Sequence, residues 1–279
     1  MKIAYGTYAM PTVSLEQALQ AVSEIGYDGI EFAIGPKHHS MPEQWDSAMR
    51  GQVKRMLSEL HLGVPSLFML SSVFTEDAGV HKGNLRLTRQ VAELARDLDL
   101  GPNPVLSMGI GGKSALWETQ REQIVRLLED YAKVASDEGF VLAVEPHVHA
   151  AVDRTDRALW LMNALDNPLI RLHFDIVHLY LAGEAIEETV SALVPYTAHT
   201  HVTDARIYEK GFELVLLGQG ELDCTAYVKA MHKAGWTDFI TVEVSTMVWS
   251  KEDYDPFAAA SFSYATLNKA FKEAGVPRP

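Results

Sequence analysis

The chain of 279 residues has one cysteine, Cys224, so no disulfide bond can form within it. It has no apolar run approaching the roughly 18 residues of a membrane-spanning helix. Cationic side chains are few: 24 lysines and arginines stand against 37 acidic residues, a net charge of −13. This excess of negative charge repels polyanions and argues against a nucleic-acid or membrane partner. Because the first residues, MKIAYGTYAMP, include no apolar signal segment, we expect a cytoplasmic protein.

Several motifs that define other enzyme classes are also absent. The turn after the first expected strand lacks GxGxxG, so a dinucleotide-binding fold has little support. There is no GxSxG nucleophile elbow. No lysine ends an expected strand, which disfavours a Schiff-base aldolase. Since no linker rich in proline, glycine or serine divides the chain, we expect residues 1–279 to form a single domain.

The sequence does contain a regular alternation of short apolar segments and longer amphipathic ones. Strands are expected at 2–7, 29–34, 64–70, 104–109, 141–146, 170–176, 197–204 and 239–244. Helices are expected at 14–26, 43–61, 83–99, 117–138, 155–165, 184–194, 223–234 and 256–273, with a loop of about eighteen residues before the seventh. Strict alternation predicts an α/β fold with a parallel sheet, and its eight repeats predict a closed (β/α)₈ TIM barrel. A doubly wound open sheet is the alternative.

The fifth to eighth expected strands each end in a side chain that can bind a metal ion. They read VLAVE, RLHFD, TAHTH and ITVE, and their last residues are Glu145, Asp175, His201 and Glu243. In a parallel barrel the carboxyl ends of the strands converge on one mouth, where the active sites of this fold lie. Buried carboxylates repel one another unless a cation is present. Three carboxylates and one imidazole therefore predict a divalent-metal site, which suits Mn²⁺ best and is compatible with Mg²⁺, Co²⁺ or Zn²⁺.

Other polar residues near the strand ends are candidates for substrate contacts or for structural support. Glu31 ends the second strand on the same side of the barrel, where it could contact substrate or bond to neighbouring loops. His147 follows Glu145 closely and could orient it or donate to a substrate oxygen. His199 and His173 lie one layer deeper, and for both we expect a position in the core.

Taken together, these motifs resemble the xylose-isomerase-like superfamily of TIM barrels. The motifs are, in order, GYDGIEF at 26–32, VEPH at 144–147, Asp175-Ile176-Val177-His178, HVTD at 201–204, LGQGELD at 217–223 and the late Glu243. The resemblance covers nearly the whole chain. This group contains sugar-phosphate isomerases and epimerases, ketose 3-epimerases, hydroxypyruvate isomerases, inosose dehydratases and apurinic endonucleases, so the resemblance is specific for the superfamily rather than for one substrate.

The resemblance also implies roles for particular residues. It implies metal binding by four residues, Glu145, Asp175, His201 and Glu243. Glu145 and Glu243 match the pair of acid/base carboxylates of the ketose epimerases, and His178 matches a contact with a substrate oxygen. Arg206 matches a substrate-binding arginine, although it stands one residue closer to the metal histidine than in the epimerases. Those epimerases carry another glutamate six residues after the first, where this chain has Ala151.

Two reactions are the leading hypotheses for such a site. A metal that chelates a carbonyl and a neighbouring hydroxyl acidifies the carbon-bound proton between them. We therefore expect an isomerase or epimerase that acts on a small keto-sugar or related polyol through an enediolate. The alternative is a lyase or dehydratase acting on a keto-inositol or an oxidised sugar or glycoside. A non-catalytic sugar-binding subunit and an apurinic endonuclease stay open, and the negative charge disfavours the latter. The sequence selects neither the substrate nor the oligomeric state, although barrels of this superfamily commonly pair.

Overall fold

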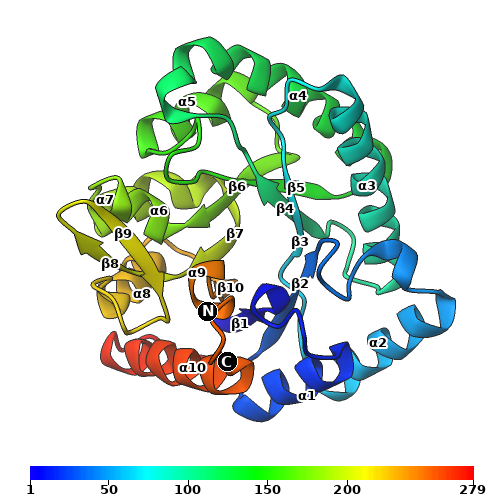
Figure 1. Cartoon of the computed structure of the whole chain (residues 1–279), viewed down its shortest axis with the longest axis vertical. Coiled ribbons are helices and arrows are strands. Elements are labelled where there is room, and N and C mark those ends of the chain that lie inside the picture. Colours follow the sequence, from blue (N-terminus) through cyan, green and yellow to red (C-terminus); the bar gives the residue numbers. More distant parts are fainter.

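Eight parallel strands close into a barrel in the computed structural model, which describes residues 1–279 (Figure 1). The barrel strands are β1 (Lys2–Gly6), β2 (Gly29–Ile34), β3 (Leu67–Ser72), β4 (Val105–Gly109), β5 (Val141–Glu145), β6 (Ile170–Asp175), β7 (Thr197–Val202) and β10 (Phe239–Val242). Each pairs with the barrel strand that follows it in the chain, and β1 pairs with β10 to complete the ring. The predicted (β/α)₈ barrel is therefore confirmed.

Helices surround the barrel and cover its outer surface (Figure 1). The longer ones are α1 (Leu15–Ile25), α2 (Ser47–Glu59), α3 (Ala78–Asp97), α4 (Trp117–Glu138), α5 (Thr155–Leu165), α7 (Ile186–Leu193), α8 (Cys224–Lys233) and α10 (Pro256–Glu273). Side-chain caps set several of their starts: Ser14 and Gln17 form a capping box at α1, and Asp223 accepts the N–H of Ala226 at α8. The apolar faces of the helices and strands together form one large buried core. No helix combines the length and the apolar character needed to cross a membrane.

The structure corrects the sequence prediction after the seventh barrel strand. The expected loop contains a hairpin, in which β8 (Asp204–Tyr208) pairs antiparallel with β9 (Gly211–Val215). Strand β7 ends at Val202 rather than at residue 204, because Asp204 already belongs to the hairpin. The hairpin strands pair only with each other and form a separate two-stranded sheet, so they leave the barrel itself unchanged.

Other boundaries also differ from the prediction. Two short helices were not predicted: α6 (Ile176–Leu181), which begins directly after β6, and α9 (Thr246–Trp249). Helix α3 begins five residues early because Asp77 caps it by accepting the N–H groups of Gly79 and Val80. Strand β3 is shifted toward the C-terminus of its predicted range, and a 3₁₀ turn at Pro42–Gln44 precedes α2.

Asp204 anchors the hairpin to the segment that follows it. Its carboxylate is fully buried and accepts backbone N–H groups from Gly218, Gly220 and Leu222, each at 2.9 Å. The backbone of Gly220 lies so close that an added Cβ would stand 2.3 Å from both Asp204 Oδ1 and the Ala205 carbonyl oxygen, so only glycine fits. The HVTD and LGQGELD motifs are therefore two halves of one local structure.

Replacing Asp204 with alanine is expected to lower the free energy of unfolding by about 3 kcal/mol or more, because these three N–H groups and that of Ala205 lose a charged acceptor. Urea unfolding of the purified protein measures this change. The matched control is Asp223→Ala, which removes an exposed helix cap in the same segment and should cost about 1 kcal/mol. Equal losses in the two variants would show that Asp204 has no special anchoring role.

Candidate active site

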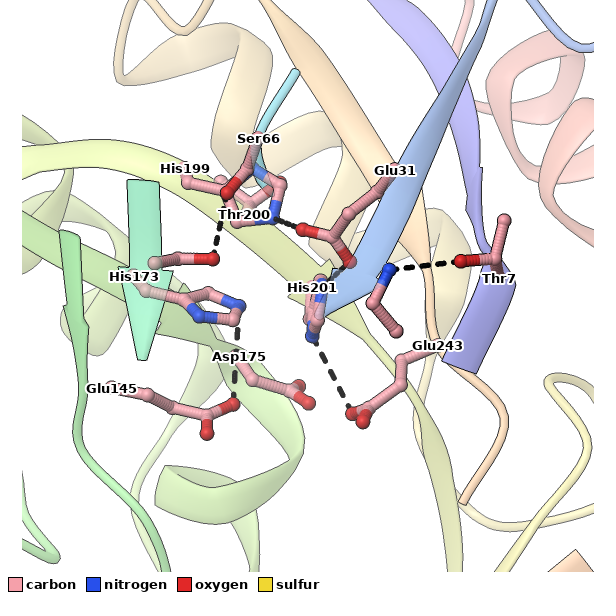
Figure 2. Close-up of polar contacts among 12 residues, drawn as sticks. Thr7, Glu31, Ser66, Glu145, His173, Asp175, His199, Thr200, His201 and Glu243 are labelled. Atoms are coloured by element: carbon pink, nitrogen blue, oxygen red, sulfur yellow. Dashed lines mark hydrogen bonds and ion pairs between the residues drawn. The ribbon is translucent and has the colours of Figure 1, made fainter. Parts of the chain in front are cut away.

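The four residues predicted to bind a metal lie together at the C-terminal end of the barrel (Figure 2). One ligand atom from each of Glu145, Asp175, His201 and Glu243 lies within 4.8 Å of the others. The strand register explains the convergence: Asp175 pairs with His201, and His201 pairs with Thr241, two residues before Glu243. Parallel pairing thus brings together side chains that are far apart in the sequence.

Two atoms of this cluster are buried without a hydrogen-bond partner. Asp175 uses Oδ1 to accept the backbone N–H of Val177 at 3.0 Å, which caps α6, whereas its Oδ2 has no partner. His201 Nδ1 also has none and lies 3.5 Å from Glu243 Oε2. Buried polar atoms are rarely left in this state. A donor set of carboxylate oxygens and one imidazole nitrogen with free lone pairs therefore fits a divalent cation.

Crowded negative charge shifts the titration of the cluster. Burial, and then the charge of Glu243, raise the pKa of Asp175 to about 7. The same two causes raise the pKa of Glu145 well above its usual range, and Asp175 adds to the effect. Burial alone would lower the pKa of His201, but the carboxylates of Glu31 and Glu243 outweigh it and hold this pKa well above the usual range. Because of these raised pKa values, the side chains of the cluster keep protons that they would otherwise lose, and a bound cation would take the place of those protons.

The two histidines predicted to contact substrate lie beside the cluster. His178 is buried on α6, with Nε2 3.9 Å from Glu145 Oε1 and 3.9 Å from Asp175 Oδ2. Burial, and then His147, lower the pKa of His178 well below its usual range, so this ring is neutral at physiological pH. His147 is exposed, and its ring centroid lies 3.7 Å from that of His178. The structure thus places both rings next to the candidate ligands.

A cleft of about 500 Å³ opens beside Glu145. Its walls are formed by Tyr8, Phe68, Met69, Leu70, Ser71, Ser72, Gly109, Gly111, Gly112, His147, His149 and Ala150. The sequence analysis missed Tyr8, which lies in a 3₁₀ turn (Thr7–Ala9) after β1. Burial and the nearby charge of Glu243 raise its pKa to about 12, so the hydroxyl stays protonated and can donate a hydrogen bond. The only sequence signal for Tyr8 is its place after the first strand.

Arg206 does not join the cluster. It is exposed on β8, and its Nε donates to the carbonyl oxygen of Gln219 at 2.9 Å. It lines a different cleft, together with Glu213 and Lys251. The hairpin, which was not predicted, carries this side chain away from the candidate ligands, so its position gives no support to the expected substrate contact.

Glu31 lies beneath the cluster rather than at its mouth. It is 1% exposed, and its two oxygens lie 2.6 Å from His199 Nε2 and 2.7 Å from His201 Nε2 (Figure 2). Burial raises the pKa of Glu31, but the two imidazoles outweigh it and lower this pKa to about 2. Because each oxygen lies against an imidazole nitrogen of β7, this position gives no support to a substrate contact and favours a structural role, although the contacts are to strand residues rather than to the neighbouring loops that were the alternative.

Comparisons with known proteins agree with this fold. A family model described as xylose isomerase-like TIM barrel matches residues 19–262, so the chain belongs to that family. An inosose isomerase of Bacillus velezensis is 23% identical over 238 residues, which cover 83% of each chain. A fructoselysine 3-epimerase of Escherichia coli O157:H7 is 20% identical, over 88% of this chain and 91% of its own. The crystal structure of the IolI protein with a bound zinc atom matches 99% of this chain and 98% of its own, with a TM-score of 0.79 at 19% identity.

The raised pKa of Asp175 predicts that the metal-free protein becomes less stable as the pH rises. In the unfolded chain an aspartate loses its proton near pH 4, whereas in the folded protein Asp175 keeps it up to about pH 7. Between these values the folded state binds more protons, so the free energy of unfolding falls with increasing pH. Urea unfolding at several pH values in the presence of a chelator measures the slope. Asp175→Asn should make it shallower, and an unchanged slope would refute the predicted titration.

Proposed function

We propose that this protein is a divalent-metal-dependent isomerase or epimerase acting on a small keto-sugar or related polyol through an enediolate. The observation that carries the proposal is the convergence of three carboxylates and one imidazole, two of whose ligand atoms are buried and unpaired. The isomerase and epimerase among the relatives support the reaction class. The zinc atom bound in the IolI structure supports a metal in a barrel of this kind.

The metal would be held by Glu145, Asp175, His201 and Glu243, with Mn²⁺ proposed first and Mg²⁺, Co²⁺ or Zn²⁺ compatible with the same donors. When bound, it would polarise the substrate carbonyl and stabilise the negative charge that develops on the oxygen. Asp175 Oδ2 and His201 Nδ1, which have no hydrogen-bond partner, would each gain a partner in the bound cation.

Proton transfer is proposed for Glu145 and Glu243, which approach the cluster from different sides of the barrel (Figure 2). One carboxylate would remove the carbon-bound proton next to the carbonyl. If the other returns a proton to the same carbon from the opposite face, the product is an epimer. Return to the neighbouring carbon gives the aldose–ketose isomer.

Substrate binding is proposed for the residues around the cleft. The neutral ring of His178 and the protonated hydroxyl of Tyr8 can each donate to a substrate oxygen, and His147 lines the cleft beside them. The cleft lining includes no lysine or arginine. Since phosphate groups are normally bound by such cations, we propose that the substrate is not phosphorylated.

A lyase or dehydratase acting on a keto-inositol or an oxidised sugar or glycoside is the second candidate. Inosose dehydratases also occur among the relatives, for example that of Clostridium perfringens. In addition, the position of the additional glutamate in the ketose 3-epimerases is Ala151 here, and this residue is fully buried. The same proton abstraction would then be followed by loss of a neighbouring hydroxyl or glycosyl group.

Solvent deuterium exchange distinguishes the two reactions. The Mn²⁺-loaded protein is incubated in D₂O with a panel of ketoses and an inosose, and the products are analysed by mass spectrometry and NMR. An isomerase or epimerase incorporates deuterium at carbon without loss of water. A dehydratase instead yields a product lighter by one water molecule. If the metal-loaded protein gave neither result with any member of the panel, the proposal would lose its chemical basis.

Glu145→Gln and Glu243→Gln should each lower kcat/KM by at least about 10²–10⁴-fold, because each removes a proton-transfer group. The control is Arg206→Ala, which lies outside the cleft and should retain activity within about threefold of the wild type. Metal content is measured for every variant, so that loss of proton transfer is separated from loss of metal. Wild-type activity in Glu145→Gln would rule out its proposed role.

A further inference from the structure

Beneath the candidate metal ligands lies a second group of buried polar residues, Glu31, His173 and His199, which we call the support layer. None is more than 2% exposed, and none takes part in the proposed proton transfer. Burying a carboxylate and two imidazoles is costly unless they interact with suitable partners. Their contacts therefore indicate why the barrel retains them.

Glu31 contacts a candidate ligand directly. Its Oε2 lies 2.7 Å from His201 Nε2, and in this hydrogen bond the imidazole N–H donates to the carboxylate. Because a carboxylate only accepts, the neutral form of His201 carries its proton on Nε2 and leaves a lone pair on Nδ1. Nδ1 is the nitrogen that lies 3.5 Å from Glu243 Oε2 within the ligand cluster. Glu31 thus selects the tautomer in which His201 can bind a cation through Nδ1.

His199 holds the other side of Glu31. Its Nε2 lies 2.6 Å from Glu31 Oε1, so each carboxylate oxygen contacts one imidazole (Figure 2). The carboxylate cannot rotate without losing one of these contacts. His199 therefore restricts the orientation of Glu31, and Glu31 in turn restricts that of His201.

His173 occupies the corresponding place beneath Glu145. Its Nε2 lies 3.8 Å from Glu145 Oε1, and neither of its ring nitrogens has a hydrogen-bond partner. The ring packs edge-on against Phe68, with centroids 5.5 Å apart, and also against His201, at 4.1 Å. A fully buried donor held this close can form a hydrogen bond to Glu145 after a small movement of that carboxylate.

A second cation is the competing explanation for these histidines. Ligand atoms of His173, His199 and His201 lie within 4.8 Å of one another. However, His199 Nε2 already contacts Glu31, and His201 has one nitrogen bonded to Glu31 and the other within the ligand cluster. The existing contacts of two of the three rings therefore favour a supporting role over a second metal site.

We propose that Glu31 is a positioning residue for the metal site, which together with His199 fixes the tautomer and orientation of His201. His173 has the corresponding role for Glu145. This inference rests on the proposed function, because it connects the support layer to the metal ligands named there.

Metal affinity measured without turnover tests the inference. Apo-protein is titrated calorimetrically with Mn²⁺ for the wild type, Glu31→Ala, Glu31→Gln and Ser66→Ala. We expect Kd to rise about 10–100-fold in Glu31→Ala. The rise should be smaller in Glu31→Gln, because an amide oxygen can still accept the His201 N–H. Ser66→Ala is the matched control: it removes an equally buried polar group, bonded to Ser107 at 2.7 Å, and should leave Kd unchanged.

Two further measurements make the outcome decisive. Circular dichroism and urea unfolding establish whether each variant is folded. If Glu31→Ala does not fold, the metal affinity of Glu31→Gln is used for the test instead. In the metal-free protein, at a pH high enough for the His201 ring to be neutral, its ¹⁵N chemical shifts report the tautomer, which should be Nε2–H in the wild type and mixed in Glu31→Ala. Unchanged Kd and unchanged chemical shifts in the Glu31 variants would overturn this inference but leave the proposed function intact. A stoichiometry of two metal ions per chain would also overturn it, whereas a wild type that binds no divalent metal would overturn the proposed function as well.

Discussion

Mutual repulsion among carboxylates that the barrel holds close together is the constraint on which the rest of the site depends. Glu145 and Asp175 are buried beside Glu243, whose negative charge disfavours the ionised form of both. Closure of the ring between β1 and β10 holds the strand ends at one mouth, so these side chains cannot simply move apart. The repulsion is relieved either by protons, as the raised pKa of Asp175 indicates, or by a cation.

Depth within the barrel separates the polar residues into groups with different contacts. The ligand cluster lies at the strand ends, the cleft with Tyr8 and His147 lies beside it, and Glu31 lies beneath it. Asp175 and His201 in the ligand cluster are as inaccessible to water as Glu31, so these groups differ in their contacts rather than in their exposure. Each Glu31 oxygen lies within 2.7 Å of an imidazole nitrogen, whereas Asp175 Oδ2, in the ligand cluster, is buried without a hydrogen-bond partner.

The prediction from sequence was correct where the structure depends on neighbouring residues. It was wrong where a hairpin and an irregular loop have similar residue patterns. Alternating apolar segments and helix caps such as Ser14 predicted the barrel, because periodicity and capping depend on neighbours in the chain. The hairpin at 204–215 was missed because its strands pair only with each other and leave several side chains exposed, as loops do. As a result, the place of Arg206 on an exposed strand outside the ligand cluster was not anticipated from the sequence.

The sequence by itself determined the family, the barrel and the four side chains that meet at its mouth, since every parallel strand delivers its last inward residue to the same end. Only the tertiary structure showed that Glu31 bonds to His201, a residue 170 positions away, rather than facing the mouth. The partner of a buried polar group depends on which distant side chains the closed barrel places against it. No local pattern of residues encodes that choice.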